Sequence, residues 1–281
     1  MCIRDRTIHW PGDASQHLTA QFSLDSSKPL ITAIEVDGKK IVDRATPIYR
    51  ASTGQRRGGW DAFFDFPPSA PEGTRSFLGE FHPQSAKAQT IGNRLDVSFD
   101  GMRLGIFTGS IHYIFYPGSR LIQQEAVMRT DQPDVAYFYD AGLKMTADAD
   151  RQPGFNMSST VAYFDTQGVF NSITPPYGSE WHPLPVRYRA IAARSGDASI
   201  AVFASPHRYF FARDYTTNMG YVWHSSWRGS VSLGVRQLPD DNSPFYPWMN
   251  APPGTEQHMG MFLLLGDAEP QRVLDDVLRY T

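Results

Sequence analysis

The stretch that decides the fold is residues 101–145, GMRLGIFTGSIHYIFYPGSRLIQQEAVMRTDQPDVAYFYDAGLKM. It contains four runs rich in Ile, Val, Tyr and Phe, which are separated by Thr-Gly-Ser, Pro-Gly-Ser and Asp-Gln-Pro-Asp. Such runs and breaks are typical of strands and turns. Each break is too short to hold a crossover helix, so neighbouring runs are predicted to pair antiparallel as a β-meander.

The same pattern continues on both sides of this stretch. Short apolar runs are separated by turn signals such as Asp37-Gly38 and Gly92-Asn93, dipeptides that favour tight hairpins. About sixteen short strands are expected in all, and the apolar run over residues 257–265 indicates a buried central strand. No repeat of fixed period is visible, which argues against a propeller or a β-helix. The sequence therefore predicts an all-β fold, a large antiparallel β-sandwich (supersandwich) with long aromatic loops and one short C-terminal helix.

The composition excludes several classes of partner. Acidic and basic side chains nearly balance, with a net charge of −3 and no block of like charge, so nucleic acid and anionic membrane surfaces are not expected partners. No run approaches the roughly 18 apolar residues of a membrane helix. Cys2 is the only cysteine, which excludes a disulfide framework. The compartment stays open, and a periplasmic or extracellular location is favoured.

Both ends of the chain carry signals about domain organisation. The first six residues, MCIRDR, look like a translated sequencing adapter on a metagenomic reading frame, so residues 1–6 are set aside as a non-native leader without structure. Residues 7–266 form the predicted single domain. Beyond it, Asp267 can cap a helix and Pro270 suits its first turn, and the helical spacing runs to the last residue with no Gly or Asn stop signal. Residues 267–281 are thus expected to start a helix that leads into a missing C-terminal region of the same chain.

Two irregular segments concentrate aromatic and charged side chains. The first, residues 52–71, has a density of rings that argues against disorder. Its ligand-binding candidates are Arg56, Arg57 and Trp60, although Trp60 and the neighbouring phenylalanines could instead fold inward as a plug over one end of the sandwich. The second, residues 205–229, holds groups that exchange protons, donate forked hydrogen bonds or stack on flat ligands. Its ligand-binding candidates are Tyr209, Tyr221, Trp223, Trp227 and Arg228.

Acid–base candidates come from this second segment and from the central stretch. In the second segment they are His207, His224 and Asp214, and the other reading of each histidine is a satisfied core residue. Glu125 lies on a strand whose two faces are both partly apolar, and a buried carboxylate needs a partner. Its alternative role is therefore a structural ion pair with Arg129 or with an arginine of a neighbouring strand.

Several strong catalytic signals are missing from the sequence. It has no Gly-x-Ser-x-Gly elbow, no P-loop, no dinucleotide fingerprint and no His-Glu-x-x-His. The histidines are scattered without a His-x-His pair, so no cofactor and no preassembled metal site is predicted, although His82, His207, His224 or His258 could meet in space. Aromatic, arginine, histidine and carboxylate groups in the loops of a sandwich fit a carbohydrate, whose CH face stacks on rings and whose hydroxyls suit polar side chains.

Two resemblances add to this reading. The run of antiparallel strands with charged and aromatic loops at one end resembles the supersandwich of galactose-mutarotase-like domains, in which a His and a Glu carry the activity; no residue here is assigned to those roles. The closing residues 261–281, MFLLLGDAEPQRVLDDVLRYT, resemble the junction in multidomain bacterial proteins where a β-rich N-terminal region precedes a PHP-type metallohydrolase domain. That resemblance implies an accessory module, with the metal-binding histidines in the downstream domain.

Three functional hypotheses remain. The first is an accessory, carbohydrate-binding β-sandwich domain of a larger bacterial carbohydrate-active or metallohydrolase protein. The second is a stand-alone mutarotase, glycosidase or lyase, in which a histidine of the second segment exchanges protons with Glu125, Asp140 or Asp214. The third is a docking platform for the missing domain, which predicts an exposed apolar patch beside the terminal helix. Convergence of a histidine and a carboxylate in one aromatic-lined groove would favour the enzyme.

Overall fold

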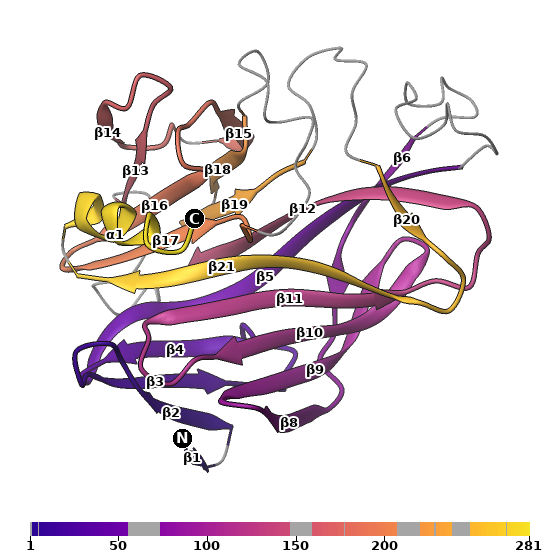
Figure 1. Cartoon of the computed structure of the whole chain (residues 1–281), viewed down its shortest axis with the longest axis horizontal. Coiled ribbons are helices and arrows are strands. Elements are labelled where there is room, and N and C mark those ends of the chain that lie inside the picture. The colour runs from indigo at the N-terminus through magenta and orange to yellow at the C-terminus, as the bar shows by residue number, and fades with distance from the viewer. Residues whose placement is uncertain are drawn as a thin grey trace.

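The computed structural model describes residues 2–4, 6–55, 74–146, 159–176, 178–206, 220–227, 229–237, 248–267 and 269–281. Within these ranges the chain forms 21 strands and one helix, and the strands pair antiparallel in two sheets that face each other (Figure 1). The predicted all-β sandwich is confirmed. Its first strand, β1 (Cys2–Arg4), pairs with β2 (Thr7–Pro11). Residues 2–4, which the sequence analysis leaves without structure, are therefore a strand, because their backbone groups extend the ladder at the edge of the sheet.

Sheet A has 11 strands in the hydrogen-bonded order β1-β2-β3-β4-β5-β12-β19-β18-β15, with β6 on β5 and β20 on β12. Two adjacent residues with positive φ, Asp37 and Gly38, make the tight β4–β5 turn that the sequence predicts. The further strands of sheet A are β3 (His17–Phe22), β4 (Ile31–Val36), β5 (Lys39–Gln55), β6 (Arg75–Leu78), β12 (Val135–Thr146), β15 (Ser179–Leu184), β18 (Val222–Trp227), β19 (Ser230–Val235) and β20 (Met249–Ala251).

Sheet B has 10 strands in the order β14-β13-β16-β17-β21-β11-β10-β9-β7, with β8 on β9. The apolar run predicted as a buried central strand is β21, which lies between β17 and β11. The strands of sheet B are β7 (Glu80–Phe81), β8 (Ala86–Ile91), β9 (Arg94–Leu104), β10 (Phe107–Phe115), β11 (Leu121–Arg129), β13 (Thr160–Phe164), β14 (Phe170–Ile173), β16 (Ala190–Ser195), β17 (Ala198–Phe203) and β21 (Glu256–Gly266).

The central stretch, residues 101–145, forms a meander of three strands rather than four. β9, β10 and β11 pair in chain order in sheet B, as predicted. The fourth run, β12, crosses to sheet A and pairs there with β5 and β19. The prediction is wrong at this point because the Asp-Gln-Pro-Asp break ends β11 without specifying its next neighbour, and β21 takes that edge instead. The turn predicted at residues 108–110 lies inside β10, and the chain turns at Gly105 and Ile106.

A single long strand, β5, replaces several predicted segments. The sequence predicts a short strand around Lys40, an edge strand over residues 45–49 and a loop from Ser52. The structure has one strand of 17 residues, with β4 and β12 on its two edges. Inside this strand, Arg44 adopts a φ of +58°. The sequence pattern predicts a break between two separate strands at this same residue. The strand is therefore central in sheet A rather than at an edge.

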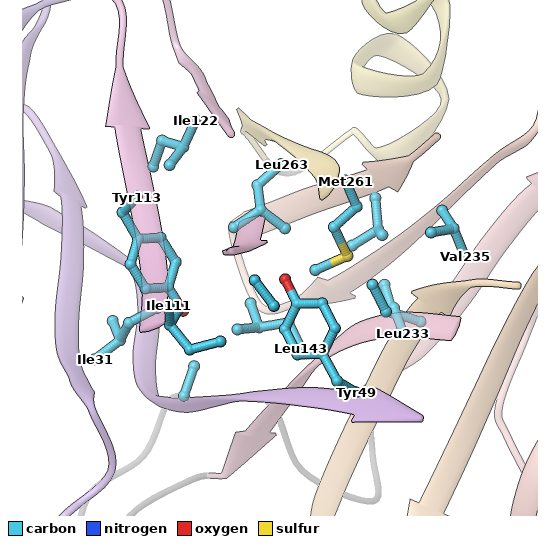
Figure 2. Packing of buried hydrophobic residues seen from close by; sticks show 14 of the residues in the cluster. Ile31, Tyr49, Ile111, Tyr113, Ile122, Leu143, Leu233, Val235, Met261 and Leu263 are labelled. Atoms are coloured by element: carbon cyan, nitrogen blue, oxygen red, sulfur yellow. The ribbon is translucent and has the colours of Figure 1, made fainter. Parts of the chain in front are cut away.

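The core lies between the two sheets (Figure 2). Alternation along each strand sends one set of side chains into this core and the other set to the outer face, the face turned away from the opposite sheet. On β11, for example, Gln124 points inward and Glu125 outward. Figure 2 shows side chains of the two sheets directed toward one another: Ile31, Tyr49, Leu143, Leu233 and Val235 from sheet A, and Ile111, Tyr113, Ile122, Met261 and Leu263 from sheet B.

Gln124 is a polar group in the middle of this core. It is fully buried, its amide donates to the Gly142 carbonyl oxygen at 3.0 Å, and its own oxygen accepts from the Tyr113 hydroxyl at 3.1 Å. Gln124→Leu leaves both partners buried without that bond, so we expect urea denaturation to show a loss of about 2–3 kcal/mol in the free energy of unfolding. Gln89→Leu, at an exposed position of β8, is the matched control and should change it by less than about 0.5 kcal/mol. Equal losses in the two variants would contradict this role of Gln124.

Helix α1 (Pro270–Val277) packs on the outer face of sheet B, against β16, β17 and β21 (Figure 1). The helical spacing and the place of Pro270 in the first turn are confirmed. The N-cap is Glu269 rather than Asp267, whose carboxylate instead accepts the Glu269 N–H. No helix among the described residues has the length and apolar composition needed to cross a membrane. The buried face of α1 consists of Pro270, Val273, Leu274 and Val277.

Candidate functional site

The predicted site residues fall into three groups. Glu125 lies on β11 of sheet B and faces outward. The structure does not bring Glu125 and His224 together, because Glu125 faces outward from sheet B whereas His224 faces the interior from sheet A, so the hypothesised acid–base pair between them is not formed. The members of the second group lie in or next to β18 of sheet A: Tyr221, Trp223, His224 and Trp227. The members of the third group lie outside the described residues: Arg56, Arg57, Trp60, His207, Tyr209, Asp214 and Arg228.

Trp223 lies flat against the outer face of sheet A. Its ring covers Gly142 and Gly234, where an added Cβ atom would come within 2.4 and 2.3 Å of the indole, and its Nε1 donates to the Val235 carbonyl oxygen at 3.2 Å. Trp181 of β15 stacks on it, with ring centroids 3.8 Å apart. Trp223 is consequently fully buried. Any part that it plays in ligand binding is indirect, as the support beneath Trp181.

Arg50 of β5 covers the Trp181 ring, with its Cζ 4.4 Å from the ring centroid. Its Nε donates to Asp140 Oδ2 at 3.1 Å, and the two residues are directly opposite in the β5–β12 register. The other carboxylate oxygen of Asp140 accepts the Gln237 backbone N–H at 2.9 Å. The Asp140 side chain is 2% exposed, whereas that of Arg50 is 28% exposed. The guanidinium is therefore fixed in position and still reaches solvent.

The backbone at Trp181 is strained. Its φ is +43°, a conformation that costs a bulky residue of order 1–3 kcal/mol, and the β15–β18 register shifts between Ser179 and His182. Strain of this kind persists where the surroundings hold it, and it is common at ligand sites. Neither Trp181 nor Arg50 is predicted as a site residue from the sequence, because neither belongs to a motif. The one available signal is the position of Trp181 in a loop rich in proline and aromatic residues.

His224 faces the interior from β18. It is fully buried, and neither ring nitrogen has a hydrogen-bond partner in the part of the chain that the structure describes. Its ring lies beside that of His182, with centroids 5.1 Å apart. Burial, together with the neighbouring His182, lowers the pKa of His224 to about 4. His224 is thus a neutral interior histidine near pH 7, although not the satisfied one of the alternative reading.

Tyr221 directly precedes β18, and Trp227 is its last residue. Tyr221 is almost fully buried, and the guanidinium carbon of Arg189 lies 5.1 Å from the centroid of its ring. Trp227 shares the outer face with Trp223 and is 41% exposed. Among the predicted binding residues that the structure describes, Trp227 has the most accessible ring.

A groove of about 600 Å³ runs over the outer face of sheet B, across β8, β9, β10, β11 and β21. Acidic and basic groups are interspersed in it, so it favours neither an anion nor a cation by net charge. A hydrogen bond from the Ser85 hydroxyl lowers the pKa of Asp100. Within the described ranges, no three His, Cys, Asp or Glu side chains are placed to share a metal ion. The polar lining of the groove includes Lys87, Arg94, Asp96, Asp100, Ser110, His112, Glu125 and His258.

Glu125 has a histidine partner in this groove. Its Oε2 lies 3.0 Å from His258 Nδ1, and its side chain is 8% exposed. Gly260 leaves room for the carboxylate, since an added Cβ there would lie 3.1 Å from Glu125 Oε1. The described partner is therefore a histidine rather than Arg129, which contacts Asp131 at 3.4 Å. The sequence alone does not pair Glu125 with His258 because 133 residues separate them.

Three further groove residues form a hydrogen-bonded row. His112 Nδ1 lies 2.9 and 3.0 Å from the two Asp96 oxygens, and its Nε2 lies 2.9 Å from the Ser110 hydroxyl. An ionised carboxylate only accepts, so in the neutral ring Nδ1 carries the proton and Nε2 accepts from Ser110. This row is not predicted from the sequence, because a turn predicted at residues 108–110 hides the alternation of Ser110 and His112 with the buried Ile111.

No family model matches the sequence, and no curated protein matches it either. Among solved structures, the GH36 alpha-galactosidase AgaB from Geobacillus stearothermophilus is similar, with a TM-score of 0.55 and 7% identity over 99% of this chain and 43% of that chain. The alpha-galactosidase AgaA A355E D548N from the same organism, in complex with raffinose, has a TM-score of 0.54 and 7% identity over 97% of this chain and 43% of that chain.

A putative aldose 1-epimerase from Escherichia coli K12 is similar over 93% of this chain and 99% of its own, with a TM-score of 0.46 and 10% identity. At these identities the likeness to the two alpha-galactosidases concerns the fold alone. The metallohydrolase region downstream of this chain stays a prediction. The chain shares its sandwich fold with less than half of each alpha-galactosidase chain.

Proposed function

We propose that this protein is a carbohydrate-binding sandwich and that an oligosaccharide lies along the outer face of sheet A. Arg50 and Trp227 contact different parts of it, because the strand registers place them three strands and six positions apart. The observation that carries the proposal is the fixed guanidinium of Arg50, held by the buried Asp140 and by the Trp181 ring while part of it reaches solvent. A forked donor that is already in place loses little entropy when it binds hydroxyl oxygens. An exposed indole such as that of Trp227 offers the apolar surface on which a sugar ring stacks.

A binding role suits this face better than acid–base catalysis. Asp140 is occupied by Arg50 and by the Gln237 N–H, and His224 is buried beside His182. Neither group is placed to move a proton at a ligand on the outer face. AgaA holds raffinose, and this fold corresponds to 43% of its chain. By analogy, we propose an accessory sugar-binding domain of a larger carbohydrate-active protein.

Two variants, Trp227→Ala and Arg50→Lys, test the proposal. The wild type should be retained on a glycan array, and calorimetric titration with raffinose and with the best-retained glycan then measures affinity. Trp227→Ala should weaken binding about five- to tenfold, because ring stacking is worth about 1 kcal/mol. Arg50→Lys keeps a positive charge opposite Asp140 but loses the fork and the flat stack on Trp181, so binding should weaken at least about tenfold.

The matched control is Arg194→Lys, at an exposed position of β16 in sheet B, which should bind like the wild type. Thermal unfolding of each variant separates lost binding from lost structure. If the wild type retains no glycan, or if both outer-face variants bind with wild-type affinity, the proposal is wrong.

A further inference from the structure

One hydrogen-bonded chain joins the Ser110 hydroxyl, the His112 ring and the Asp96 carboxylate. The Ser110 hydroxyl lies 2.9 Å from His112 Nε2, and His112 Nδ1 lies 2.9 and 3.0 Å from the two Asp96 oxygens. Both links are within the reach that proton transfer requires. Carboxylate, imidazole and hydroxyl in this order activate a serine on several unrelated folds. We propose that Ser110 is an acyl-transfer nucleophile, with His112 as its general base and Asp96 as the residue that positions His112. This proposal is independent of sugar binding on sheet A.

The sheet holds the three side chains on one face. Ser110 and His112 are two residues apart on β10, so both point outward, while the intervening Ile111 is buried. Asp96 lies diagonal to His112 on β9, because Ser98 is directly opposite His112. The side chains of His112 and Asp96 are 19% and 17% exposed. Their contact is therefore partly shielded from water, as the orienting hydrogen bond of such a site needs to be.

The rest of the groove suits a small ester. Ile91 and Ile114 line it and offer apolar surface to an acyl chain. Glu125 is directly opposite His112 in the β10–β11 register. Its carboxylate stabilises the imidazolium that forms when His112 takes the proton.

The reaction proceeds in two balanced steps. In the first, the Ser110 oxygen attacks the carbonyl carbon, its proton passes to His112 Nε2, and the bond to the leaving oxygen breaks as His112 returns the proton to the departing alcohol. In the second, water attacks the acyl carbon and gives a proton to His112. The bond from the acyl carbon to Ser110 then breaks, Ser110 takes that proton back, and a carboxylic acid leaves. Water is the only co-reactant.

A fluorophosphonate probe, which reacts with activated serine hydroxyls, tests the proposal on the full chain. The wild type should gain a single label at Ser110, located by intact mass and peptide mapping, and should release p-nitrophenol from p-nitrophenyl acetate with an initial burst. Ser110→Ala should abolish the label. His112→Gln keeps a side chain that can hydrogen-bond but cannot accept the proton, so labelling should slow at least about 100-fold.

Ser98→Ala is the matched control, because Ser98 lines the same groove opposite His112, and it should label like the wild type. Asp96→Asn should slow labelling and move its pH profile to lower pH, since the imidazole loses one counter-charge while Asp100 and Glu125 remain; a purely structural contact would not shift the profile. Thermal midpoints within a few degrees of the wild type show that a variant is folded. A wild type that does not label, a label that persists in Ser110→Ala, or an unchanged rate in a folded His112→Gln overturns the proposal.

Discussion

Trp223→Ala should lower the free energy of unfolding by about 3–5 kcal/mol, measured by urea denaturation. Trp223 is fully buried, and its ring fills the space between Trp181 and the glycines at positions 142 and 234. Truncation opens a cavity that no side chain of β12 or β19 can fill at those glycines. It also removes the indole donor from the Val235 carbonyl oxygen.

Trp227→Ala is the matched control, because this tryptophan lies on the same face of the same strand and is 41% exposed. It should cost less than about 1 kcal/mol. Gly234→Ala should also destabilise, since its Cβ would lie 2.3 Å from both the Trp223 indole and the Ala141 carbonyl oxygen, and overpacking of this kind costs about 1–3 kcal/mol. If Trp223→Ala and Trp227→Ala lose equal stability, the stack does not hold sheet A together.

The protein should lose stability as the pH falls from about 6.5 to 4, and His224 should account for about 3 kcal/mol of that loss. Burial lowers its pKa from 6.5 to about 4, so the unfolded chain binds the proton more readily than the folded one. The contribution of His224 is therefore fully present above pH 6.5 and disappears progressively as the pH approaches 4. Between pH 7 and pH 5 the expected change is about 2 kcal/mol, which urea denaturation at each pH measures.

In His224→Leu this part of the acid dependence should vanish. The apolar replacement should also cost little free energy of unfolding, since neither ring nitrogen of His224 has a hydrogen-bond partner among the described residues. His17→Gln, at an exposed position of β3, controls for the loss of any histidine. Its free energy of unfolding should change with pH as that of the wild type does. If the free energy of unfolding changes equally between pH 7 and pH 5 in the wild type and in His224→Leu, His224 stays solvated and the prediction is wrong.

Much of the local structure could be predicted from the sequence. The Asp-Gly signal at Asp37 and Gly38 marks a hairpin because these residues tolerate the positive φ that the turn requires. The alternation along β11 correctly separates Glu125 from the core-facing Ala126 and Met128. The failures come where one residue mimics a break, as at Arg44 inside β5, or where a Thr-Gly-Ser turn signal lies within β10. Tertiary pairing overrides a turn propensity at such positions.

The candidate site could be predicted only in part. The alternation predicts that Tyr221 and Trp223 share a face, but Tyr221 packs into the core between the sheets. Trp223 lies on the outer face and is buried there by Trp181, which reaches it from β15. Glu125 is a candidate because a carboxylate between apolar neighbours needs a partner. The partner, His258, belongs to the last strand of sheet B.

The sequence by itself determined that this protein consists of antiparallel strands, and it determined which side chains share a face within a correctly predicted strand, such as Ala126 with Met128 on β11. Only the tertiary structure decided which strands far apart in the sequence are neighbours, and with them the pairs Arg50–Asp140 and Glu125–His258, whose members are 90 and 133 residues apart. The physical reason is that the backbone groups along any strand edge are alike. A strand therefore carries no local mark of its partner, and the choice depends on burying all the apolar faces of both sheets at once.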